Sequence, residues 1–399
     1  MTSRRGFIAG LGVASVGAMA QGTAEVETSE YLLPPGLIHL NTASLAATPR
    51  VVLDRTLQAW RDLESSPVAM AYYTSPDTVL TAAEQVRERA ARFLGCEPDE
   101  LLITRCTTEG MNTVSQGIRW TAGDHVLTTN LEHDGGSMCW AYQAQRRGVV
   151  VDKVAIALDE HDSNAIVQRF AAAITPQTRV ISVSHIISSI GLRMPIVEIS
   201  ALARQRGILC VVDGAQAGGA MPVDVKALGC HAYATSGHKW LMGPKGTGLL
   251  YVSRDASEAI RPIQWQDAHT YGAESAGVGP LPLALGLGAA IERMQNIGMA
   301  EVERHNVALR NRAYAELARM KRLRVVGPPP GPLATGIVAC ILPAEIDSMK
   351  LRDTLLHKQR IIVKMSEKRQ FNGFRLSPHI LNTEAQVDTA LAALRAELA

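Results

Sequence analysis

The feature that most constrains the fold is a series of short apolar runs rich in β-branched residues, separated by segments with helical spacing. These runs are continuous and show no polar alternation, so we expect each to be a strand covered by helices on both faces. Strands of this kind form mostly parallel sheets, which predicts a doubly wound α/β large domain. The seven runs are residues 101–104, 125–129, 149–156, 180–184, 208–212, 232–235 and 247–252.

Residues on either side of this series have other patterns. Helical spacing predicts helices at 51–63 and 79–94, with Gly95 as a C-cap, and a helix at 283–297. Beyond residue 299, helices alternate with short strands, which predicts a small α+β domain. Its expected strands are 335–342, 360–364 and 374–377. We divide the chain into a signal peptide (1–20), an N-terminal arm (21–50), a large domain (51–260), and an interface loop, helix and small C-terminal domain (261–399).

The first twenty residues differ from the rest of the chain. Arg4 and Arg5 precede an uncharged, mildly apolar run that ends in Ala18-Met19-Ala20. This resembles a twin-arginine signal peptide, since the apolar run is shorter than the roughly 20 residues of a membrane span. We therefore expect export in the folded state to the periplasm or another extracytoplasmic space. An uncleaved membrane anchor is the alternative.

Charge and cysteine content exclude some classes of function. A formal net charge of +2, without a basic cluster interleaved with aromatic residues, argues against a nucleic-acid partner. The six cysteines are far apart and have no metal-ligand spacing, so we expect no metal site. Buried thiols are the default interpretation, and a disulfide in an oxidising compartment is the alternative.

Lys239 stands where an apolar strand ends and a Gly/Pro turn begins, in the segment ATSGHKWLMGPKG (234–246). A lysine held over a cleft loses hydration, which favours the neutral, nucleophilic amine that forms a Schiff base. The alternative is a surface lysine beside a β-turn. Two other motifs, CVVDGAQ (210–216) and TTEG (107–110), bear on this choice.

The three motifs, in this order, resemble the class V aminotransferase family of pyridoxal phosphate enzymes, and the isopenicillin N epimerase-like branch in particular. The resemblance covers the chain from Leu37 to the C-terminus. It implies the fold of type I enzymes of this class, pyridoxal 5′-phosphate as cofactor, and a homodimer with two active sites at the interface. The cofactor would be attached to Lys239.

The resemblance also implies a role for each site residue. The pyridine nitrogen needs a buried carboxylate to stay protonated, and Asp213 follows a strand as required. In relatives, the residues matching Gln216 and His133 bond the ring oxygen and stack on the ring, and those matching Thr107, Thr108, Ser236 and His238 hold the phosphate. The alternatives are an Asp-Gly turn, a structural histidine and a simple helix N-cap for the threonine pair.

Two departures from the family pattern are visible. Ser188 stands where cysteine desulfurases carry an Asn that bonds the ring oxygen. Gly277-Val278 stands where relatives place Gly-Thr, so the hydroxyl expected to reach the neighbouring subunit's phosphate is missing.

The segment FRLSPHILNT (374–383) resembles the family's C-terminal signature, whose arginine binds the substrate α-carboxylate. Arg375 is therefore the predicted substrate anchor, since a planar guanidinium binds a carboxylate through two hydrogen bonds. A strand-edge arginine in a surface ion pair is the alternative. Asn41, from the N-terminal arm, is a second substrate-binding candidate.

The expected activity is a reaction at the α-carbon of an amino acid or a peptide-like amine: epimerisation, transamination or elimination. Lys239, His133 and Asp213 are the expected catalytic residues. A cysteine desulfurase is not expected, because residues 364–373 contain no cysteine to accept sulfur.

The alternatives are a carbon–sulfur lyase or a tailoring enzyme of siderophores or other natural products, both with the same fold, and a non-catalytic binding or maturation protein. A nucleotide-dependent oxidoreductase is disfavoured by the glycine spacing of GPKGTG (243–248).

Overall fold

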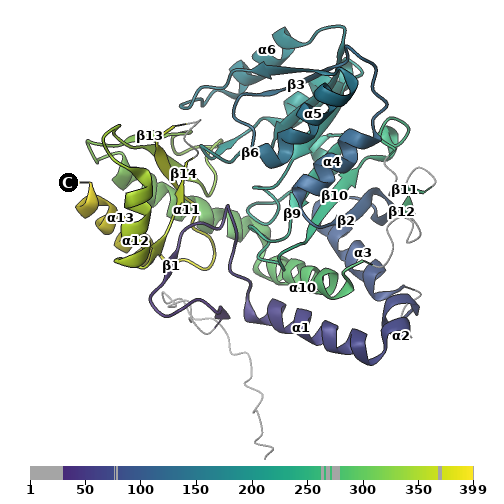
Figure 1. Ribbon diagram of the computed structural model, residues 1–399, viewed down its shortest axis with the longest axis horizontal. Helices are drawn as coiled ribbons and strands as arrows, with labels where there is room; N and C mark the ends of the chain where they lie inside the picture. The colour runs from purple at the N-terminus through teal and green to yellow at the C-terminus, as the bar shows by residue number, and fades with distance from the viewer. Residues whose placement is uncertain are drawn as a thin grey trace, which may run out of the picture.

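The computed structural model describes residues 30–398 except 76, 78, 79, 262–264, 267–269, 272–278 and 367–370. Its centre is a seven-stranded sheet in the order β2-β10-β9-β8-β5-β3-β4 (Figure 1). Only β10 runs antiparallel to its neighbours, which confirms the prediction of a mostly parallel sheet. The strands are β2 (Leu101–Thr104), β3 (His125–Thr129), β4 (Val150–Val154), β5 (Thr178–Ser184), β8 (Leu209–Asp213), β9 (Ala232–Ser236) and β10 (Gly248–Val252).

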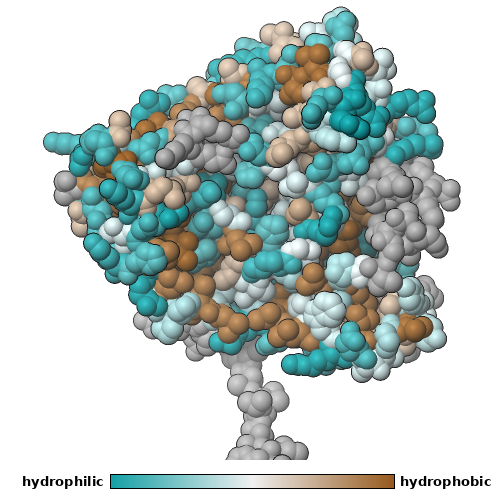
Figure 2. Space-filling model, viewed as in Figure 1, coloured by the Kyte–Doolittle hydropathy of each residue, from teal (hydrophilic) through white to brown (hydrophobic). Residues whose placement is uncertain are grey.

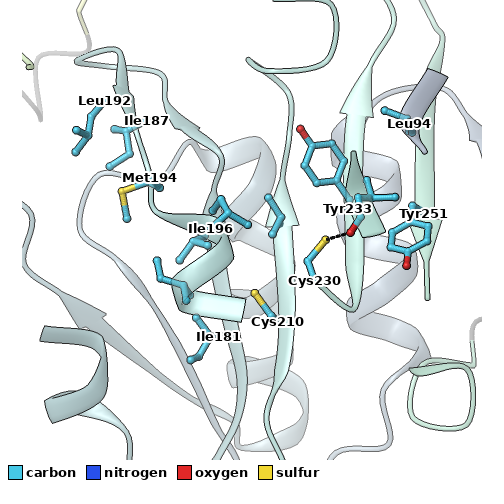
Figure 3. Packing of buried hydrophobic residues seen from close by; sticks show 14 of the residues in the cluster. Leu94, Ile181, Ile187, Leu192, Met194, Ile196, Cys210, Cys230, Tyr233 and Tyr251 are labelled. Carbon is cyan, nitrogen blue, oxygen red and sulfur yellow. Dashed lines mark hydrogen bonds between the residues drawn. The ribbon is translucent and has the colours of Figure 1, made fainter. Parts of the chain in front are cut away.

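Helices cover both faces of this sheet, because successive strand residues point to opposite sides. Leu127, Val212 and Tyr233 belong to the core on one face, whereas Val126 and Val211 belong to the core on the other. Figure 3 shows part of the first core, where Leu94 of α3 joins Tyr233 and Tyr251. The first core includes the helices α3 (Ala82–Leu94), α6 (Ser163–Ala173), α7 (Ile196–Gln205) and α10 (Leu281–Ile297), and the second includes α4 (Thr107–Gly117) and α5 (Asp134–Arg147).

A further hydrophobic core lies in the C-terminal part of the chain. A four-stranded sheet in the order β13-β14-β17-β16 packs there with three helices. The N-terminal arm joins this core through β1 (Ile38–His39), which pairs in parallel with β15 (Ile361–Ile362). The elements are α11 (Met299–Leu317), β13 (Arg324–Val326), β14 (Val338–Ile341), α12 (Ser348–His357), β16 (Lys364–Met365), β17 (Gly373–Leu376) and α13 (Glu384–Glu397).

The remaining described elements are short or peripheral. Helix α1 (Arg50–Ser65) packs against α10, and α2 (Pro67–Tyr72) follows it directly. Several two-residue strands form separate hairpins. The other elements are β6 (Ile186–Ile187), β7 (Leu192–Arg193), α8 (Val225–Leu228), β11 (Trp265–Gln266), β12 (Thr270–Tyr271) and the 3₁₀ turns Pro98–Glu100 and Arg254–Ala256.

Three local predictions need correction. The helix expected from residue 79 begins at Ala82, because Thr81 and Glu84 form a capping box there. The strand expected at 360–364 is two strands, β15 and β16, which belong to different sheets. Helix α2 was not expected. The C-cap at Gly95 is confirmed, with φ of 73°. The domain boundaries stay predictions.

No helix within the described part of the chain is long and apolar enough to cross a membrane. The segment that resembles a signal peptide and the pair Gly277-Val278 lie outside the described residues.

Candidate active site

The polar residues that follow the strands of the large sheet meet at one edge. Asp213 at the end of β8 lies opposite Ser184 of β5 and Ala234 of β9. A cavity of about 220 Å³ opens there, where the theory of open α/β sheets places a ligand. It is lined by every residue predicted to bind the cofactor: Thr107, Thr108, His133, Ser188, Asp213, Gln216, Ser236, His238 and Lys239.

Lys239 lies just beyond β9 and is buried in this cavity. Its pKa is lowered to about 8, chiefly by burial and also by the positive charge of Arg375, whereas Asp213 acts in the opposite direction. A pKa of about 8 leaves about a tenth of the amine neutral at pH 7, against fewer than one in a thousand at 10.5. The position excludes the alternative of a surface lysine and fits a nucleophilic amine.

Asp213 is also buried, with 7% of its surface exposed, and its carboxylate accepts a hydrogen bond of 2.9 Å from the Ala215 N–H. Burial raises its pKa, while Lys239 and His133 act to lower it. The carboxylate lies against Gly136 of α5, where any β-carbon would overlap with it. The backbone of α5 is thus in direct contact with the group expected to face a pyridine nitrogen.

The start of α4 closes another side of the cavity. Thr107 donates its backbone N–H to the Ser236 hydroxyl over 3.1 Å, and the two hydroxyl oxygens are 2.7 Å apart. Cys106, not Thr107, occupies the N-cap position, and its side chain makes no capping bond. The simple N-cap interpretation of the threonine pair is therefore wrong. Backbone N–H groups at a helix start together with hydroxyl donors suit a phosphate.

His133 and Gln216 are fixed by protein contacts. A ring nitrogen of His133 accepts the Gly135 N–H over 2.9 Å and caps α5, so the residue is structural as well as cavity-lining. Gln216 donates to the Ala43 carbonyl over 3.0 Å and accepts from the Trp240 indole over 2.8 Å. The orientation of both side chains is set before any ligand binds.

A second cavity of about 260 Å³ adjoins the first, and Lys239, His133, Ser188 and Gln216 line both. Arg375 of β17 lines the second cavity and is 7% exposed. It therefore is not a strand-edge residue in a surface ion pair.

The Arg375 guanidinium is held by neutral groups. It donates to the Ser188 carbonyl over 2.7 Å and to the Ser44 hydroxyl over 3.1 Å, while its buried Nε has no partner among the described residues. Burial lowers its pKa to about 10, so it stays charged at neutral pH. A buried guanidinium with unused donors is suited to a carboxylate from a ligand.

Asn41 is not among the residues that line either cavity, and its role stays a prediction. The same arm contributes Ala43 and Ser44 to the second cavity instead. Sequence reasoning did not single out Ser44 or Lys364 as site residues. The only signal in the sequence was their position. Ser44 lies three residues after Asn41, and Lys364 lies in the segment that precedes the Arg375 motif.

Comparison with known proteins agrees with this geometry. The family model of class V aminotransferases matches residues 38–389. Isopenicillin N epimerase of Amycolatopsis lactamdurans is 30% identical over 91% of this chain and 96% of its own length. A probable cysteine desulfurase of Pseudomonas aeruginosa is 33% identical over 75% of this chain and 78% of its own.

Among solved structures, the apo cysteine desulfurase from Thermococcus onnurineus superposes with a TM-score of 0.80 at 23% identity. The match covers 95% of this chain and 99% of that one. Fold and site define a type I enzyme of the pyridoxal phosphate class. More narrowly, the chain belongs to the class V aminotransferase family.

The cofactor is pyridoxal 5′-phosphate, and the first cavity fits it. The amine of Lys239 is available for attachment, the Asp213 carboxylate is buried, and the Thr107–Ser236 pair stands at a helix start. Within the described residues, no group of acidic, histidine or cysteine side chains could hold a metal ion.

Proposed function

We propose that the protein is a pyridoxal phosphate enzyme that acts at the α-carbon of an amino acid or a peptide-like amine, as an epimerase, a transaminase or a lyase. One observation carries the proposal: Lys239, with a pKa of about 8, lies where a cofactor-sized cavity meets a second cavity that contains Arg375. The Lys239 amine can thus reach both the cofactor in the first cavity and the substrate in the second.

The bound cofactor supplies an electron sink for the pair of electrons left when a bond to the α-carbon breaks. Arg375 holds the substrate carboxylate and so sets the orientation of the α-carbon bonds. Lys239 Nζ removes the α-proton. Epimerisation then requires a proton on the opposite face of the α-carbon, transamination requires a proton on a different carbon, and elimination requires the loss of a substituent from the neighbouring carbon. Asp213 holds a proton at the pyridine nitrogen, where its negative charge favours the protonated form.

The cysteines support the exclusion of desulfurase activity. A desulfurase needs a thiolate that reaches the substrate sulfur. Within the described part of the chain, Cys106 is the cysteine that lines the cofactor cavity, and none lines the cavity of Arg375. Cys340 lies on β14, where burial raises its pKa to about 12. All six cysteines are free thiols.

The carbon–sulfur lyase and natural-product tailoring reactions remain alternatives within the same chemistry. A non-catalytic binding or maturation protein is the alternative of another class. Lys239, Asp213 and Arg375 argue against it, because a protein without catalysis does not need a buried nucleophilic amine between two cavities.

Borohydride reduction tests the proposal. The purified protein is expected to be yellow, and reduction followed by peptide mapping is expected to place the cofactor on Lys239. A Lys239→Arg variant should lose both the colour and the reaction.

Incubation with L-cysteine then distinguishes the possible reactions. Pyruvate and sulfide indicate a lyase, whereas alanine with a persulfide on Cys106 or Cys340 contradicts the exclusion of desulfurases.

The proposal includes a homodimer and export by the twin-arginine route. Helices α1 and α2 carry exposed apolar side chains, including Trp60, Val68 and Tyr72, and Figure 2 shows apolar patches on the face where α1 and α10 lie. Such patches are typical of subunit interfaces. Sedimentation of the holoenzyme should give twice the mass of one chain, which is 42.9 kDa for the full sequence and smaller once residues 1–20 are removed. A monomer at micromolar concentration contradicts this part.

A further inference from the structure

The cavity beside Lys239 contains a second cation. Lys364 of β16 and Arg375 of β17 both line it, and they lie directly opposite each other in the antiparallel pair. Opposed residues on neighbouring strands project from the same face, with β-carbons about 5 Å apart. Two positive side chains therefore share one face of the small sheet and one cavity.

This arrangement is unfavourable without a ligand, because like charges opposite each other destabilise a strand pair. Among the described residues that line the second cavity there is no aspartate or glutamate. Neither Lys364 nor Arg375 has an ion pair within the described residues. Arg193, another partly buried cation, pairs with Glu303.

Hydrogen-bond donors without partners also indicate that the cavity binds an anionic ligand. Of the five N–H donors of a guanidinium, Arg375 uses two, and its buried Nε has no partner among the described residues. The buried hydroxyl of Ser189, in the same cavity, also has no partner there. Buried donors left without partners are costly, so a ligand with several acceptor oxygens would offset that cost.

The two cations differ in burial, and this difference predicts which part of the ligand each of them contacts. Arg375 is buried and is close enough to Lys239 to lower the pKa of that amine, whereas Lys364 is exposed. Arg375 is therefore the residue expected to bind the ligand carboxylate next to the reacting carbon. Lys364 faces the part of the ligand nearer to solvent.

We propose that the substrate is an amino acid or a peptide-like amine with a second carboxylate, which Lys364 binds while Arg375 holds the α-carboxylate. This inference rests on the proposed function and specifies its substrate class. A substrate with one carboxylate would leave Lys364 without a counterion in the cavity.

Unreactive acids test the inference without knowledge of the reaction. Glutarate and pentanoate have five carbons each and differ in the second carboxylate. Calorimetric titration of the holoenzyme should show glutarate binding about 10-fold more tightly, the size expected for one charge-assisted contact. In Lys364→Met this preference should disappear while the affinity for pentanoate stays unchanged. Lys364→Arg should retain the preference, and Lys350→Met, which removes an exposed lysine of α12, should behave as wild type.

Each other outcome has a defined meaning. Equal affinities for the two acids in the wild-type holoenzyme overturn the inference and leave the proposed function intact. An equal loss for both acids in Lys364→Met also overturns it, since both cations would then hold one carboxylate. The visible absorbance of the holoenzyme is checked first, and its absence overturns the proposed function together with this inference.

Discussion

The reactivity of Lys239 depends on a balance between burial and two charged neighbours. Burial and Arg375 favour the neutral amine, and Asp213 favours the ammonium form. Because the pKa is lowered, the ammonium form dominates below about pH 8 and the nucleophilic amine above it. The attachment of the cofactor to the apoprotein should follow the same dependence.

We expect the rate of cofactor attachment to apoprotein to rise with pH and to reach half its maximum near pH 8, measured by stopped-flow absorbance with free pyridoxal phosphate. Arg375→Met removes a positive charge that lowers the pKa of Lys239, so the midpoint should move to higher pH. Lys350→Met, which changes an exposed lysine that lines neither cavity, serves as the control. A wild-type midpoint near 10.5 would contradict the structural account of this amine.

The sequence predicts a site residue correctly where the chemistry requires one particular type of side chain. Lys239, Asp213 and Arg375 line the cavities, and the task proposed for each is one that few other side chains can do; a motif marks each one. Ser44 and Lys364 could not be found in this way. They enter the site through the parallel pairing of β1 with β15 and the antiparallel pairing of β16 with β17, which bring together residues distant in sequence.

At the scale of elements, the position of α5 relative to β8 determines the shape of the cofactor cavity. Gly136 lies in the first turn of α5 and packs against the Asp213 carboxylate at the end of β8. No side chain fits between them without movement of the helix or the carboxylate. Most of the seven strands were predictable because they are apolar on both faces, although the edge strand β4 includes Asp152 and Lys153. This contact was not, since it depends on how closely a helix approaches a strand.

Gly136→Ala should therefore weaken cofactor binding about 10-fold or more, because overpacking a tight contact costs about 1–3 kcal/mol and would displace Asp213. Equilibrium dialysis of pyridoxal phosphate measures the effect, with circular dichroism to verify the fold. Gly331→Ala is the matched control, since its nearest neighbour would be 3.9 Å from the new β-carbon and its φ is not positive. Equal affinities of the two variants would refute the importance of this contact.

At the scale of the whole molecule, the two cavities are built from residues between Ala43 and Arg375. The arm contributes Ala43 and Ser44, the large sheet contributes Asp213 and Lys239, and the C-terminal sheet contributes Arg375. The substrate cavity is therefore complete only when these three parts have come together. If the protein is exported as proposed and acquires its cofactor in the cytoplasm, it must cross the membrane after the cofactor cavity, lined by residues 106–239, has formed.

This requirement gives the proposed twin-arginine signal a testable consequence. Arg4→Lys with Arg5→Lys should leave a yellow, cofactor-loaded precursor in the cytoplasm and no mature form outside, because the double change removes the pair that the signal depends on. Fusion of residues 21–399 to a signal for unfolded export should deliver protein without bound cofactor. Fractionation with visible spectra and immunoblotting separates the two results. Mature, yellow protein outside the cytoplasm in the double variant would show that export does not use this route, even though folding before export would still be required.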